Sequence, residues 1–175
     1  TRRSSDLPER MNAELIWFRN GYIEYKFSRG DLNSNRTLVD NIQFSMEICS
    51  EAPNYNNEWP SDITLWVNDV EVTTWNSPGD FGGVRGKLNP DWWYEYASQY
   101  GILKTWDITN VGTFEDGRRV SDVKVTDVHL DNNSFIKLKV GIKDNATNKG
   151  GVNLFGKKFG NHNQSIIMKI RYSLL

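Results

Sequence analysis

The amino-acid sequence predicts an all-β protein, a two-sheet antiparallel β-sandwich of the jelly-roll type. Short segments in which apolar and polar residues alternate recur along the chain, and this period of two is typical of strands with one buried face. Turn residues separate these segments at short intervals, as they do in sandwiches and barrels. No segment keeps the helical period of 3.6 residues for three turns.

The chain has 175 residues, which is a usual size for one domain. Residues 1–12 are polar and contain Pro8, so we expect a linker or a disordered terminus there. The sandwich is then expected to span residues 13–175.

The first two expected strands, residues 15–18 and 22–27, flank Asn20-Gly21. Asn-Gly is a strong signal for a two-residue turn, because both of its positions adopt positive φ readily. We therefore predict a hairpin here, and a second hairpin at Asn68-Asp69.

Alternation predicts further strands, for a total of about nine or ten. They lie at residues 42–48, 63–67, 70–72, 102–108, 120–125, 136–142 and 166–172. The one helical candidate is a turn or two at residues 91–96, where Pro90 stands at the first helical position.

The composition excludes several classes of protein. Lys and Arg together number 21, and Asp and Glu 22, so the net charge is −1 and unaided binding to duplex DNA is not expected. Seven Trp, seven Tyr and eight Phe are too many aromatic residues for a disordered segment. No apolar run approaches the roughly 20 residues that cross a bilayer, so we expect no membrane partner.

Cys49 is the single cysteine, which excludes an internal disulfide and a Cys-x-x-Cys zinc site. The only histidines are His129 and His162, so we expect neither a metal site nor a cofactor. Glu47 and Glu51 lie close to Cys49 in sequence, and negative charge does not favour a reactive thiolate.

Two long loops interrupt the alternation, at residues 77–87 and 150–161. We expect them to meet the Trp92-Trp93 turn at one end or one face of the sandwich, because long ordered loops on a β scaffold commonly carry binding sites. The candidate ligand-binding residues are Asp80, Phe81, Arg85, Trp92, Trp93, Asn153, Phe155, Lys158 and Asn161.

The ligand chemistry is open at this stage. The glycines around Arg85 could form an anion cradle, or they could only permit a tight loop. Trp92 or Trp93 could cover the apolar face of a sugar ring, with Asp80 and Asn153 bonding its hydroxyls. The alternative is that these loops only pack on one another and close the core.

Catalysis is not expected, because no nucleophile–base motif is visible. The carboxylates that could form an acid–base pair for glycoside hydrolysis are Glu47, Glu51, Glu58, Asp62 and Asp80, although charged residues on sandwich loops are usually only solvated. The alternating lysines Lys137, Lys139 and Lys143 could touch DNA phosphates or could form a solvated face that blocks edge pairing.

Several ordered strings carry a resemblance to a known family. They are residues 14–18 (ELIWF), 21–25 (GYIEY), 49–53 (CSEAP), 59–66 (WPSDITLW), 75–83 (WNSPGDFGG), 88–93 (LNPDWW), 99–106 (QYGILKTW), 151–156 (GVNLFG) and 161–166 (NHNQSI). Together the chain from Ala13 to Tyr172 resembles the C-terminal domain that follows an ArsR-like winged-helix domain in a group of bacterial transcriptional regulators.

The resemblance implies a cytoplasmic ligand-sensing or dimerisation domain with a β-sandwich fold. Its expected partner is a small molecule, with carbohydrate as one candidate class, and a homodimer is left open. DNA would be bound only through a winged helix, which these 175 residues lack. The alternatives are a free carbohydrate-binding module and a glycoside-active enzyme.

Overall fold

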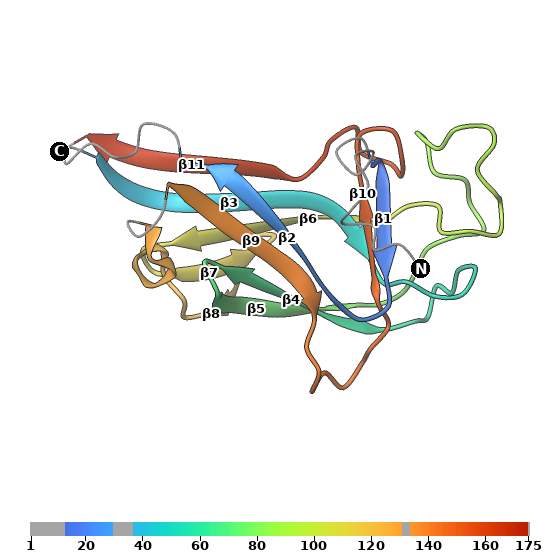
Figure 1. Ribbon diagram of the computed structural model, residues 1–175, viewed down its shortest axis with the longest axis horizontal. Coiled ribbons are helices and arrows are strands. Elements are labelled where there is room, and N and C mark those ends of the chain that lie inside the picture. Colours follow the sequence, from blue (N-terminus) through green and yellow to red (C-terminus); the bar gives the residue numbers. More distant parts are fainter. Residues whose placement is uncertain (1–12, 30–36, 131–133, 175) are drawn as a thin grey trace.

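The computed structural model describes residues 13–29, 37–130 and 134–174 and shows two antiparallel sheets packed against each other (Figure 1). In chain order, the elements of the described part are β1 (Leu15–Phe18), β2 (Gly21–Ser28), β3 (Thr37–Cys49), β4 (Ser61–Val67), β5 (Val70–Ser77), β6 (Ile102–Thr109), β7 (Gly112–Glu115), β8 (Arg118–Ser121), the 3₁₀ turn η3 (Val125–Val128), β9 (Phe135–Ile142), β10 (Val152–Phe155) and β11 (Ile167–Leu174). The predicted all-β sandwich is confirmed.

The topology is that of a jelly roll. Strand β1 pairs with β10, β2 with β9, β3 with β6 and β4 with β5, all antiparallel. These four pairs form one long ribbon that is rolled into two sheets, with the orders β1-β10-β3-β6 and β2-β9-β4-β5. Strands β7 and β8 extend the first sheet beyond β6, and β11 pairs with the first part of β3.

Alternation along β3 builds the core between the sheets. Ile42, Phe44, Met46 and Ile48 are all fully buried (0% exposed), and they pack with apolar residues of the facing sheet. The rings of Trp75 on β5 and Trp106 on β6 meet edge to face, with centroids 6.4 Å apart. Side chains at every second position of a strand share one face, so the alternation of apolar and polar residues in the sequence predicted these strands.

The opposite face of the first sheet is buried at one end. Cys49 alternates with the core residue Ile48, and Phe155 alternates with Leu154, so both point away from the core. A second apolar cluster forms there from Cys49, Phe155 and Phe159, with Leu15, Phe81 and Trp93 packed against it. Phe81, Trp93 and Phe159 come from loops, and loops of this part of the chain lie at the right-hand end of Figure 1, close to β1 and β10.

The Asn68-Asp69 hairpin is confirmed, with φ of 48° and 68° at the turn between β4 and β5. The predicted hairpin at Asn20-Gly21 is wrong, because β1 and β2 belong to different sheets. Gly21 does take a positive φ of 87°, but it turns a corner of the sandwich. Each strand gains a partner inside a larger sheet, whereas an isolated two-stranded hairpin is only marginally stable.

Three other local predictions are wrong. Residues 152–155, expected in a loop, form β10 between β1 and β3. Residues 91–96 form no helix: Trp93 N bonds Pro90 O at 2.9 Å and Ala97 N bonds Tyr94 O at 3.2 Å, which are separate turns. The strand expected at residues 120–125 ends at Ser121, and a 3₁₀ turn begins at Val125.

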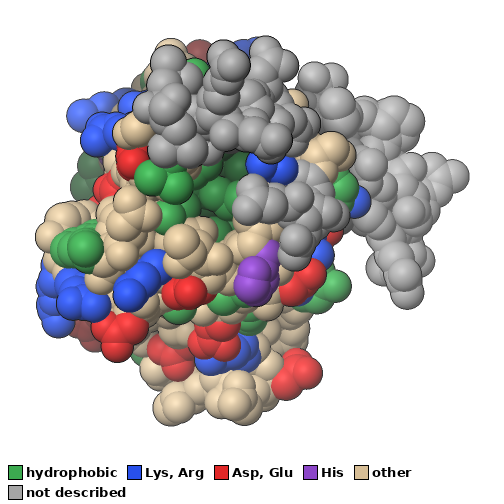
Figure 2. All heavy atoms as spheres, turned by 90° about the vertical axis from the view of Figure 1, so that its left-hand side faces the viewer, with side chains coloured by type: hydrophobic (Ala, Val, Ile, Leu, Met, Phe, Trp, Pro, Cys, Tyr) green, Lys and Arg blue, Asp and Glu red, His purple; other side chains and the backbone are tan. Residues whose placement is uncertain are grey.

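The opposite end of the sandwich carries a mixed surface. Figure 2 shows apolar side chains in a hollow there, with acidic and basic side chains interspersed around it. Among the described residues, no helix has the length and apolar character needed to span a membrane.

Candidate functional site

The three segments expected to form a site do meet. The backbone N–H of Lys87 donates to Asn161 Oδ1 at 3.0 Å, and that of Leu88 donates to Gly160 O at 3.0 Å. The Trp93 ring meets the Phe159 ring edge to face, with centroids 5.0 Å apart. These contacts join residues 77–93 to the loop after β10.

Glu47 anchors this assembly from the outer face of β3. Its fully buried carboxylate accepts hydrogen bonds from the backbone N–H groups of Gly101 (2.9 Å), Asn161 (2.9 Å) and His162 (2.8 Å). Gly160 has a φ of 78°, and a Cβ there would lie 2.3 Å from Glu47 Oε1. The carboxylate therefore fixes the loop, and the glycine permits its close approach.

Asp80 is a second fully buried carboxylate. Its Oδ2 accepts hydrogen bonds from Ala52 N at 2.9 Å and from the Ser98 hydroxyl at 2.8 Å. Burial raises the pKa of Asp80 to about 6, and the nearby charge of Glu51 raises it as well, against the lowering effect of those hydrogen bonds. A side chain expected to touch ligand thus lies beneath the surface.

Asn153 continues this polar network. Its side-chain N–H₂ donates to Ser50 O at 2.7 Å and to the Ser98 hydroxyl at 3.1 Å, so Ser98 links Asn153 to Asp80. Phe155 is fully buried in the second apolar cluster. Phe81 is half-buried and stacks on Tyr100, with ring centroids 5.6 Å apart.

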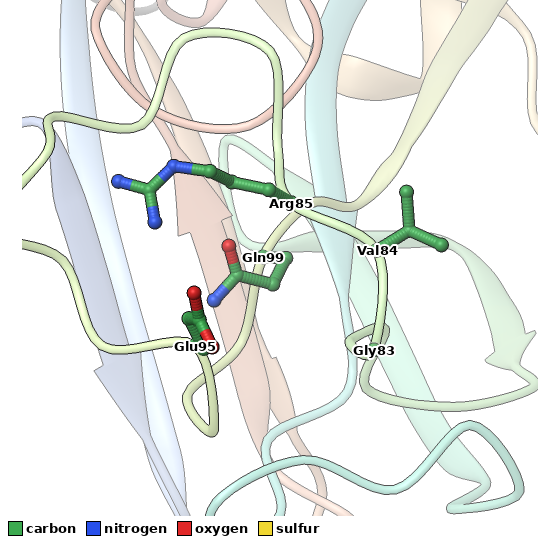
Figure 3. A pocket seen from close by; sticks show the side chains of 5 residues that line it. All are labelled: Gly83, Val84, Arg85, Glu95 and Gln99. Carbon is green, nitrogen blue, oxygen red and sulfur yellow. The ribbon is translucent and has the colours of Figure 1, made fainter.

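Arg85 is exposed, but its guanidinium donates to the backbone carbonyls of Trp93 and Pro90. Figure 3 shows the hollow of about 220 Å³ beside it, where Arg85 and Val84 point away from each other. Arg85 therefore ties the loop to the Trp turn rather than presenting a free cation to an anion. Lys158 is exposed, and its backbone N–H donates to Glu14 at 3.0 Å.

A second hollow, of about 210 Å³, lies where β1 and β10 meet the covering loops, and we call it the aromatic groove. Its lining residues are Leu15, Trp17, Glu51, Ala52, Pro53, Asn54, Trp93, Tyr96, Ala97, Ser98 and Asn153. Trp17 on β1 is directly opposite Asn153 on β10, so the two side chains rise from the same face of the sheet. The groove therefore combines aromatic rings with amide, hydroxyl and carboxylate groups.

Two of the sequence-predicted residues, Trp93 and Asn153, line this groove. Trp92 does not: it is 68% exposed and packs on the rings of Phe159 and Trp93. Asp80 stands behind the groove through its bond to Ser98. Phe81, Phe155, Arg85 and Asn161 make contacts that hold the surrounding loops, and Lys158 contributes its backbone N–H only.

Sequence reasoning missed Trp17, Tyr96 and Glu51 as lining residues. No signal in the sequence indicated Trp17, because β1 is apolar at all four positions and only the structure shows Trp17 as more exposed than Ile16 and Phe18. Trp17 is 58% exposed and Tyr96 60% exposed. Nothing local indicated that residues 51–54 approach β1.

The lysine row on β9 and directly after it is paired with acidic side chains. Lys137 Nζ lies 2.6 Å and Lys139 Nζ 3.2 Å from the carboxylate of Asp69, and Lys143 Nζ lies 2.6 Å from Glu71. Within the described ranges, no three His, Cys, Asp or Glu side chains gather as a metal ion would require.

A comparison with protein-family models matched none of them, and a comparison with curated proteins found no match. The fold and the groove are therefore the basis for a functional proposal, together with the motif resemblance.

Proposed function

We propose that this chain is the ligand-sensing domain of a cytoplasmic bacterial regulator of the ArsR-like kind, and that it binds a small molecule in the aromatic groove without transforming it. One observation carries the proposal: exposed rings and fixed polar groups from four separate segments converge on one hollow. Concave sites lined by rings and a few oriented polar groups are typical of ligand pockets. The motif resemblance supplies the regulatory context.

Strand β1 offers a route from ligand to regulator. It contributes Leu15 and Trp17 to the groove and is the first described strand. Four residues pair it with β10, and Gly156 N adds a bond of 2.7 Å to Glu14 O. A ligand held between Trp17 and the Trp93 turn would fix β1 more firmly. In the proposed regulator the winged helix precedes β1, so this would shift the population of DNA-binding arrangements.

A thermal-shift screen tests the binding step. The probes are common sugars, amino acids, nucleosides and quaternary amines, added to the wild-type chain and to Ala97→Trp, which fills the groove. We expect at least one probe to raise the wild-type melting temperature, because a ligand that binds only the folded state stabilises it. The shift should disappear in Ala97→Trp and persist in Val111→Trp, a matched change at an exposed turn outside the groove.

The proposal falls if no probe shifts the wild-type melting temperature, or if the shift survives in Ala97→Trp. Circular dichroism of the unliganded variants separates a filled groove from a damaged fold. The regulatory step is tested on the full-length gene product, whose affinity for its own promoter DNA should change when the stabilising probe is added, and should not change in Ala97→Trp.

A further inference from the structure

We infer that the ligand of the aromatic groove is an uncharged saccharide, an inference that rests on the proposed function. Sugar recognition needs an aromatic face for the C–H side of the ring and fixed polar groups for its hydroxyls. The groove supplies both within one hollow of about 210 Å³, which is close to the size of a single sugar ring.

Two of the rings that line the groove, those of Trp93 and Tyr96, are held in place before any ligand arrives. Trp93 donates its indole N–H to Ser98 O at 2.8 Å. Tyr96 stacks on Tyr94, with centroids 5.3 Å apart and an angle of 18° between the rings. Trp17 is carried by a paired strand and is 58% exposed. Exposed rings that are already fixed lose little conformational freedom when they bind.

The backbone segments that carry the polar groups are fixed as well. The backbone of Glu51 is anchored by its N–H, which donates to Gly150 O at 2.7 Å. Asn54 follows in the same segment with a left-handed φ of 66°, a conformation that asparagine tolerates better than most residues. Asn153 is held by its bonds to Ser50 and Ser98. Carboxylate and amide oxygens accept hydrogen bonds, which suits sugar hydroxyl donors.

The charges of the groove argue against an anionic ligand. Among its lining residues, all of which lie in the described part of the chain, Glu51 carries the only formal charge. Asp80 stands directly behind Ser98. Arg85, the cation of the neighbouring loop, is engaged by backbone carbonyls. A sugar phosphate or sugar acid would therefore meet negative charge without a compensating cation.

Rings with one carboxylate also form cages for quaternary ammonium groups. The saccharide is favoured here because two polar side chains of one segment, Glu51 and Asn54, line the groove together with the rings, and the buried amide of Asn153 lies beside Trp17. A quaternary ammonium group cannot form hydrogen bonds with the amide of Asn54, whereas the hydroxyls of a sugar can bond to that amide and to Glu51.

Isothermal titration calorimetry decides between these ligands. The probes are methyl glycosides of glucose, galactose, mannose and xylose, with disaccharides of the same sugars, glucose 6-phosphate and tetramethylammonium. The proteins are the wild-type chain, Trp17→Ala, and Trp92→Ala as a matched control, since Trp92 is at least as exposed but lies outside the groove. Both side chains are surface-exposed, so neither change should unfold the protein.

We expect at least one neutral sugar to bind, with an affinity reduced roughly tenfold or more in Trp17→Ala and unchanged in Trp92→Ala. Glucose 6-phosphate should bind more weakly than the matching neutral glycoside. The inference is overturned if no neutral sugar binds, or if Trp92→Ala weakens binding as much as Trp17→Ala. Trp17-dependent binding of tetramethylammonium alone would refute the saccharide but leave the sensing groove intact. Failure of every probe in both assays would remove both proposals.

Discussion

The Ser98 hydroxyl donates a hydrogen bond of 2.8 Å to the buried carboxylate of Asp80, and Ser98 itself lines the aromatic groove. The carboxylate thus lies one side chain behind the proposed ligand surface. The same oxygen of Asp80 also accepts the bond from Ala52 N, which positions the segment that carries Glu51 into the groove. Protonation of one buried group is therefore linked to the placement of two groove walls.

Asp80→Asn should stabilise the protein at neutral pH. Folding raises the pKa of Asp80 from its ordinary value of 3.8 to about 6, chiefly through burial. A carboxyl whose pKa is raised in the folded state stabilises the folded protein fully below about pH 4, and this contribution is lost as the pH rises to about 6. The shift in pKa corresponds to a loss of about 3 kcal/mol in the free energy of unfolding. Asparagine stays neutral, and its carbonyl oxygen can keep the bonds from Ala52 N and Ser98.

Urea unfolding of both proteins between pH 4 and pH 8 checks this. Relative to the wild type, the free energy of unfolding of Asp80→Asn should increase from pH 4 to about pH 6. Above pH 6 the difference between the two proteins should stay constant. A difference between the two proteins that stays the same at every pH would show that folding does not raise the pKa of Asp80.

Glu47→Gln should destabilise the protein by about 2–4 kcal/mol. The amide N–H₂ of glutamine would face backbone N–H groups that now donate hydrogen bonds to the Glu47 carboxylate. Those donors belong to Gly101, Asn161 and His162, so the loop after β10 should lose its anchor. Urea unfolding at pH 7 measures the change, and Glu58→Gln on an exposed loop position is the matched control. Equal stability of the two variants would contradict an anchoring role.

The sequence predicted the jelly roll because most strands bury one face only. Ile42, Phe44, Met46 and Ile48 face the core, and the residues between them on the first part of β3 are less buried, so alternation of polarity follows alternation of burial. The pattern failed at β10, where both faces are covered. Asn153 is polar but buried, because loops distant in sequence lie over it.

The meeting of the loops could be predicted from their shared departure from alternation, but the groove could not. Its floor and walls depend on the register that sets Trp17 opposite Asn153, a pairing between strands far apart in the chain. The structural roles of Glu47 and Asp80 could not be predicted from the sequence either. As sequence they are two acidic residues among many, and only the backbone donors that approach them make them internal anchors.

Cys49 should react with a thiol reagent only when the protein unfolds. Burial raises the pKa of its thiol well above the ordinary value, and the negative charges of Asp80 and Glu47 raise it further, against the lowering effect of hydrogen bonds from Phe81 and Asn153. The reaction with Ellman's reagent at pH 8 should be slower in the native protein than in urea by at least about a hundredfold. Fast labelling of the folded chain would show that the second apolar cluster, which contains Cys49, opens in the native protein.

The chain alone should show no sequence-specific binding to duplex DNA. Its net charge is −1, and the lysines that alternate along β9 are engaged by Asp69 and Glu71. Phosphate binding would require these cations to leave their carboxylates, so little counterion release could drive association. The face in Figure 2 likewise mixes acidic with basic side chains.

Fluorescence anisotropy with labelled promoter DNA at about 0.15 M salt measures this, with Asp69→Asn as an informative variant. Asp69→Asn removes the carboxylate that Lys137 and Lys139 share, leaves Lys137 paired with Glu24, and should raise only the nonspecific, salt-sensitive affinity. If the proposed function holds, a regulator that joins this chain to a winged helix should bind the same DNA specifically. Tight, sequence-dependent binding by the 175-residue chain would mean that the sandwich reads DNA itself, and the sensing role proposed for it would then need a different partner domain.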